Sequence, residues 1–153
     1  MSLLIEGVKE ATREQTRLLD VAMDCLPEDK HDWCAGGCSK TPLQIYGECA
    51  GIYAWAAHFL AGKAPLEWEA FMSRFQGTTG LGEARVLMEQ AEAQFLAALD
   101  TIDESRLQEE VEPGFGLKLP LGQYIFLPSY HTCYHSGQIN YIQTLLGDAE
   151  MHF

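Results

Sequence analysis

Two histidines, His131 and His135, stand four residues apart in the segment HTCYHSGQINYI, which contains no Asp, Glu, Lys or Arg. Four residues are about one turn of an α-helix, so both imidazoles of a helical segment reach the same patch. Their nitrogens can then bind one metal ion if a third ligand comes from another helix. The spacing indicates a metal site, although two ordinary polar side chains would produce the same pattern.

His58 is the predicted third ligand. Between Gly47 and Ala61 the chain is almost wholly apolar, and Glu48 and His58 are its only residues with an acidic or basic side chain. On a helix, most of the residues next to His58 are small, which leaves room for a cavity beside the imidazole: Gly51, Ala54, Trp55, Ala61 and Gly62.

Three neutral nitrogen ligands are typical of an open catalytic site, in which water or a substrate completes the coordination. Because no carboxylate ligand is expected on these helix faces, zinc or nickel suits the site better than calcium or magnesium, with iron as an alternative. Glu48 lies ten residues before His58, about 15 Å along a helix, which is too far for direct contact. No general base or other catalytic residue is therefore assigned.

A helical projection predicts which side of the last helix faces the core. Turning by about 100° per residue places an apolar stripe on the side of His131, and polar residues on the opposite side. The predicted inward stripe contains Tyr124, Leu127, His131, His135, Gln138, Ile142, Leu145 and Leu146. The predicted solvent face contains Ser129, Thr132, Cys133, Ser136, Asn140, Gln143 and Thr144, which separates Cys133 from the histidines.

A second group of metal-binding residue types, His31, Cys34 and Cys38, lies in a polar, glycine-bearing segment. The cysteines are separated by three residues and no second cysteine pair follows, so a structural zinc site there is the weaker interpretation. The chain has five cysteines, an odd number, and they are expected to be reduced thiols.

The periodicity of apolar residues predicts four long helices. They cover residues 3–26, about 41–62, about 81–98 and a last segment ending at Gly147, which starts either near Leu121 with a kink at Pro128 or near Pro128 itself. Thr41, Pro42 and Gln44 form a capping box at the start of the second helix. A loop over 27–40, a short helix over 65–75 and a hairpin or extended loop over 105–121 connect them. This order predicts an all-α, four-helix bundle in a single domain, residues 1–153.

The composition excludes several classes of function. Twenty-two acidic residues against ten Lys and Arg give a net charge of −12, which opposes binding to phosphate backbones, so nucleic acid is not an expected partner. No apolar run is long enough to span a membrane, and the first residues lack the pattern of a secretion signal. A cytoplasmic protein is expected.

His58 near the end of the second helix and the later pattern HxxxHxGQI, from His131 to Ile139, resemble the DinB-like (DinB/YfiT) superfamily of four-helix metalloproteins. The resemblance covers nearly the whole chain. It implies up-down-down-up connectivity, a long crossover between the second and third helices, and a divalent ion held by His58, His131 and His135. It also implies a homodimer and, as in some relatives, thiol-dependent S-transfer or isomerisation with a low-molecular-weight thiol.

Two hypotheses of function follow. In the first, the chain is a metal-dependent enzyme, an S-transferase or a hydrolase, whose ion ionises a thiol or water to attack a small-molecule substrate. Gln138, close to one turn after His135, would orient a ligand or the substrate. In the second, the chain is a non-catalytic helical module with a structural or vestigial metal, which acts through dimerisation or partner binding.

Overall fold

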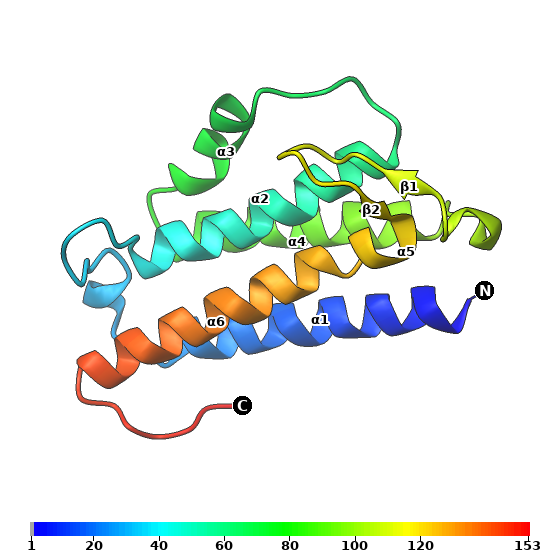
Figure 1. Ribbon diagram of the computed structural model, residues 1–153. Coiled ribbons are helices and arrows are strands. Elements are labelled where there is room, and N and C mark those ends of the chain that lie inside the picture. The colour runs from blue at the N-terminus through cyan, green and yellow to red at the C-terminus, as the bar shows by residue number, and fades with distance from the viewer. Residues whose placement is uncertain (1) are drawn as a thin grey trace.

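A computed structural model describes residues 2–153 and consists mainly of helices. The long helices are α1 (Leu3–Asp24), α2 (Pro42–Leu60), α4 (Leu81–Leu99) and α6 (Leu127–Leu145). Figure 1 shows that α1 and α6 run in one direction and that α2 and α4 run in the other. The fold is therefore the predicted four-helix bundle with up-down-down-up connectivity.

The parallel helices α2 and α4 pack against each other, and α2 also contacts α3 and α6. Parallel neighbours cannot be joined by a tight turn, so residues 61–80 cross the length of the bundle and carry the short helix α3 (Trp68–Gln76) (Figure 1). A Cβ atom at Gly47 of α2 would lie 2.0 Å from the carbonyl oxygen of Phe75. Glycine at this position permits the close approach of α3 to α2.

The start of α2 has the predicted capping box. Thr41 Oγ1 accepts a hydrogen bond from the backbone N–H of Gln44, and the Gln44 side chain accepts one from the N–H of Thr41. The helix is buried on most of its faces, as its apolar composition predicts. None of the helices in residues 2–153 is both long and apolar enough to cross a lipid bilayer.

The segment before the last helix forms the predicted hairpin. Strands β1 (Glu110–Val111) and β2 (Leu119–Pro120) pair antiparallel, with Val111 opposite Leu119. The short helix α5 (Leu121–Tyr124) follows, and α6 begins separately with Pro128 in its first turn, where no backbone N–H is required. The predicted start near Pro128 is therefore confirmed, and a single helix that runs from Leu121 with a kink at Pro128 is wrong, because α5 ends at Tyr124. Two short 3₁₀ helices, η1 (Glu28–Lys30) and η2 (Glu104–Arg106), complete the structure.

The predicted solvent face of α6 is wrong in part. Cys133, Asn140 and Thr144 are exposed, but four other polar residues of that face are buried: Ser129, Thr132, Ser136 and Gln143.

Hydrogen bonds explain the burial of this polar face against α1. The hydroxyls of Ser129 and Thr12 lie 3.1 Å apart, and Gln143 Nε2 donates to the carbonyl oxygen of Ala22 at 2.7 Å. Hydroxyl groups that are satisfied in this way can be buried at little cost, and small side chains let two helices approach closely. The helix therefore presents polar residues to α1 and its histidines toward α2.

Candidate metal site

Three side chains from two helices form the candidate site: Glu48 of α2, and His131 and His135 of α6. Their ligand atoms all lie within 4.8 Å of one another. The Nε2 atoms of the two histidines are 3.2 Å apart, and Glu48 Oε1 is 3.7 Å from His131 Nε2 and 3.8 Å from His135 Nε2. Ligands bound to zinc at about 2.0–2.1 Å in tetrahedral geometry lie about 3.4 Å apart, so the three atoms suit one ion.

The two oxygens of Glu48 have different partners. Oε2 contacts the ammonium group of Lys40 and accepts a hydrogen bond from Gln76 Nε2 at 3.3 Å, whereas Oε1 faces the imidazoles. The neighbouring imidazole of His131, together with the ammonium group of Lys40, lowers the pKa of Glu48 to about 2. The carboxylate is therefore ionised at neutral pH, with one oxygen free to bind a cation.

Gln138 fixes the protonation of His135. The amide oxygen of Gln138 lies 2.6 Å from His135 Nδ1, and because an amide oxygen only accepts hydrogen bonds, Nδ1 carries the proton. In the neutral ring, the lone pair is then on Nε2, which faces the other two ligands. Burial, and to a lesser extent the neighbouring His131, lowers the pKa of His135 and favours this neutral form. A ligating histidine usually has such a partner on its second nitrogen.

His131 is less completely supported. Its side chain is about one-quarter exposed, and its Nδ1 atom is buried without a hydrogen-bond partner among the described residues. The rings of His131 and His135 meet edge to face, with centroids 4.3 Å apart. Two nitrogen lone pairs directed at each other repel, so either a proton or a cation between the rings stabilises this arrangement.

The three side chains line a cavity of about 820 Å³, within the range of small-molecule sites. Its wall is apolar near Ile45, Ile142 and Leu145, and polar near Lys40 and Tyr134. Tyr134 accepts a hydrogen bond from Gln138 Nε2 at 3.2 Å, which leaves its own hydroxyl proton free to donate. The cavity can therefore hold a small molecule against the three ligand atoms.

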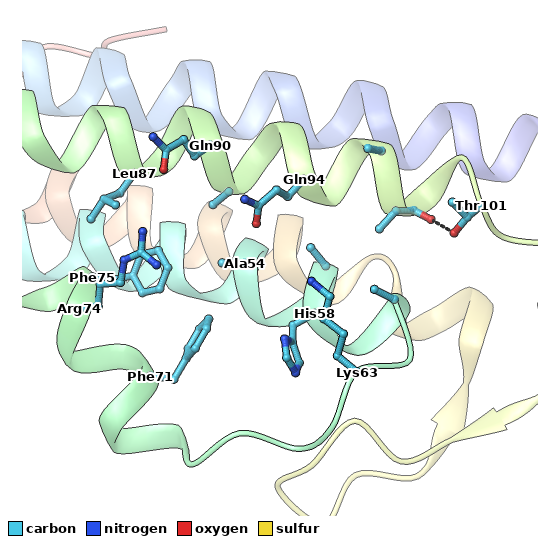
Figure 2. Close-up of a pocket in the computed structure, with 15 residues that line it drawn as sticks. Ala54, His58, Lys63, Phe71, Arg74, Phe75, Leu87, Gln90, Gln94 and Thr101 are labelled. Atoms are coloured by element: carbon cyan, nitrogen blue, oxygen red, sulfur yellow. Dashed lines mark hydrogen bonds between the residues drawn. The ribbon is translucent and has the colours of Figure 1, made fainter.

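The structure does not bring His58 to this group. His58 lies ten residues after Glu48 on α2, and its Nε2 atom donates to the carbonyl oxygen of Ala64 at 2.6 Å. It lines a different cavity, of about 540 Å³, beside Ala54, Ala57 and Ala61 (Figure 2). The small residues around His58 do leave a cavity, as predicted, but Glu48 is the residue of α2 that faces the histidines of α6.

The cysteine-bearing loop does not form a metal cluster among the described residues. Cys34 and Cys38 are exposed free thiols, and Cys34 Sγ lies 3.3 Å from Ser39 Oγ. Hydrogen bonds from Ser39 and from the backbone of Gly36 lower the pKa of the Cys34 thiol. Cys38 lines the cavity of the candidate site. Cys133 is exposed, as its predicted direction requires.

No protein-family model matches the chain, and no curated protein matches it either. Solved structures do match. YfiT from Bacillus subtilis, described as a probable metal-dependent hydrolase with an unusual four-helix bundle topology, has a TM-score of 0.76 and 14% identity. The match covers 96% of this chain and 90% of that one.

Two further solved structures differ in what they bind. A mycothiol-dependent maleylpyruvate isomerase has a TM-score of 0.69 and 14% identity over 91% of this chain, which spans only 63% of the isomerase. The colibactin self-resistance protein ClbS, solved in complex with a double-stranded DNA, has a TM-score of 0.68 and 13% identity over 92% of this chain and 95% of ClbS. Similarity at this level of identity establishes a fold and not an activity. The chain therefore shares the four-helix-bundle fold of YfiT and of a DinB-like protein from Bacillus subtilis.

Proposed function

We propose that the chain is a divalent-metal-dependent enzyme that acts on a small molecule, with Glu48, His131 and His135 as the metal ligands. The observation that carries this proposal is the convergence of one carboxylate oxygen and two imidazole nitrogens within 4.8 Å at the wall of a large cavity. Two histidines and one carboxylate are the ligand set of open catalytic zinc sites and of non-haem iron(II) sites. Zinc is the proposed ion, with iron and nickel as alternatives.

Hydrolysis is the reaction that this ligand set supports best. A bound divalent cation supplies an activated water near neutral pH and polarises a carbonyl or phosphoryl oxygen. The chain's own groups then bind and orient the substrate: Lys40 places a positive charge at the cavity wall, and Tyr134 can donate a hydrogen bond to a substrate oxygen. The apolar side chains of Ile45, Ile142 and Leu145 would hold the remainder of the substrate away from water.

Thiol-dependent group transfer is the second candidate, supported by the similarity in fold to a mycothiol-dependent isomerase. In this reaction a low-molecular-weight thiol would bind in the cavity beside Glu48, His131 and His135. The cavity has room for both a thiol and a substrate. Cobalt(II)-substituted protein separates the two candidate reactions. Coordination of a thiolate changes the absorption spectrum of the cobalt protein, and thiol-dependent transfer requires this coordination. Hydrolysis requires no thiolate, so it predicts no such change.

The test of the proposed function is turnover by zinc-loaded protein of a panel of activated esters, amides and phosphoesters, with and without added thiols. We expect at least one substrate to be converted, and Glu48→Ala to abolish the reaction. Glu112→Ala, which removes an exposed carboxylate of the hairpin, is the matched control and should keep it. If zinc-loaded protein converts no substrate, with or without added thiols, the result would support the second hypothesis, in which the chain is a non-catalytic helical module. Homodimerisation stays a prediction, which light scattering of the purified protein would test.

A further inference from the structure

The cavity beside His58 has an unusual charge for this protein. It lies between α2, α4 and the crossover that carries α3, and it shares no lining residue with the candidate metal site. Its described lining contains Lys63, Arg74 and His58 but no Asp or Glu, although the chain has a net charge of −12. The lining itself therefore places no negative charge beside a bound anion.

The two cations of this cavity differ from most others in the chain. Among the described residues, seven of the ten Lys and Arg form ion pairs with Asp or Glu: Lys9, Arg17, Lys30, Lys40, Arg85, Arg106 and Lys118. Of the three that form no such pair in residues 2–153, Lys63 and Arg74 both line this cavity. Their charges are therefore available to a ligand.

The rest of the lining suits the body of a small organic molecule. Phe71, Phe75 and Leu87 offer apolar surface, and Arg74 is held over the ring of Phe75 at 5.6 Å from its centroid. Figure 2 shows Gln90 and Gln94 of α4 across the cavity from Phe71 and His58. The volume of about 540 Å³ is typical of small-molecule sites.

We propose that this cavity is a second ligand site, which binds a small organic anion with an aromatic or branched apolar body. Lys63 and Arg74 stand at opposite ends of the cavity (Figure 2), so the anionic head pairs with one of them, and the amides of Gln90 and Gln94 are further hydrogen-bond donors. The apolar body packs on Phe71 and Leu87. The site is separate from the metal ligands, so its occupancy does not depend on the proposed enzymatic function.

The experiment uses metal-free protein, so that a carboxylate cannot bind through a metal ion. Binding of 4-fluorobenzoate and of its neutral counterpart 4-fluorobenzyl alcohol is measured by ¹⁹F NMR, with phenyl phosphate as a competitor to compare the two anionic heads. We expect the wild-type protein to bind 4-fluorobenzoate at least tenfold more tightly than the alcohol. We expect the double variant Lys63→Gln, Arg74→Gln to lose at least tenfold in affinity for the anion.

Two control variants make the result specific. Arg106→Gln with Lys118→Gln removes two exposed cations elsewhere and changes the net charge equally, so it should bind as the wild type does. Ala97→Leu adds bulk at an exposed position of the cavity wall on α4 and should weaken binding while the charges remain. The proposal is overturned if the wild type binds neither probe, if the alcohol binds as tightly as the anion, or if the two double variants behave alike.

Discussion

At the scale of single residues, Gln138 decides which nitrogen of His135 can bind a metal ion. Its amide oxygen holds the proton on Nδ1 and leaves Nε2 directed at His131 and Glu48. Partners of this kind orient the ligand and raise its basicity. Gln138 is thus a positioning residue for the proposed metal site, one step removed from the ion.

Replacing Gln138 should therefore weaken metal binding without removing a ligand. For Gln138→Leu we expect a loss of about 10- to 100-fold in zinc affinity, the usual effect of removing such a partner. Competition with a chromophoric chelator measures the affinity. Tyr134→Phe, which removes the hydroxyl on the other side of Gln138, is the control and should change the affinity much less. Equal affinities for all three proteins would show that Gln138 does not position His135.

The pKa of Glu48 predicts a pH dependence of stability in the metal-free protein. The folded state lowers this pKa from 4.5 to about 2, so between these values the unfolded chain takes up a proton that the folded chain does not. The contribution of the carboxylate is therefore complete above pH 4.5 and is lost as the pH falls toward 2. The free energies of unfolding in urea of wild type and Glu48→Gln should show the full contribution of the carboxylate above pH 4.5. As the pH falls toward 2, the wild type should lose stability relative to the variant. A difference independent of pH would contradict the assignment.

The sequence predicted the two histidines of the proposed metal site but not its carboxylate. The spacing of His131 and His135 is a local property of one helix, so it could be read from the sequence. Whether Glu48 or His58 faces them depends on the relative position of α2 and α6, which no local pattern encodes. Glu48 and His58 are the only acidic or basic residues of a largely buried helix. A carboxylate in such a helix needs polar partners, and this requirement was the signal that could have indicated Glu48 as a ligand.

At the scale of elements, glycine sets the distance between α2 and α3. A Cβ at Gly47 would overlap the backbone of Phe75, which cannot move away as a flexible side chain could. Gly7 of α1, in contrast, has no neighbouring atom within 4 Å of the position that a Cβ would take. The two helical glycines therefore provide a matched pair for a test of packing.

We expect opposite changes in stability for the two alanine substitutions. Gly47→Ala should destabilise the protein by about 1–3 kcal/mol or more, because overpacking forces α3 away from α2. Gly7→Ala should stabilise it by up to about 1 kcal/mol through helix propensity alone. Thermal unfolding followed by circular dichroism gives both values. A stable Gly47→Ala variant would mean that α3 does not pack closely on α2.

The helices themselves were largely predictable from the sequence, because apolar periodicity, the capping box at Thr41 and the stop at Gly147 are local signals. The orientation of α6 was predicted only in part. Polarity alone predicts exposure, but the hydroxyl of Ser129 and the amide of Gln143 have partners on α1. The hydroxyl of Thr132 donates to the carbonyl oxygen of Pro128 in α6 itself. Burial of satisfied polar groups depends on the neighbouring helix and cannot be read from one helix alone.

At the scale of the whole molecule, the net charge of −12 predicts that this chain does not bind DNA, although ClbS, which has a similar fold, was solved in complex with a double-stranded DNA. An acidic surface repels phosphates over about a Debye length, and the effect is largest at low salt. We expect no binding of a fluorescein-labelled DNA duplex in anisotropy measurements, even at about 10–20 mM salt. Binding that weakens steeply as salt is added would overturn this prediction.

We propose that a metal ion is held by Glu48, His131 and His135, and that His58 takes no part. The most direct test is elemental analysis of protein purified without a histidine tag and equilibrated with zinc. Wild type and His58→Ala should retain a zinc ion per chain after desalting, whereas Glu48→Ala and His135→Ala should retain little. Loss of zinc from His58→Ala together with retention by Glu48→Ala, or negligible zinc in the wild type, would contradict the account.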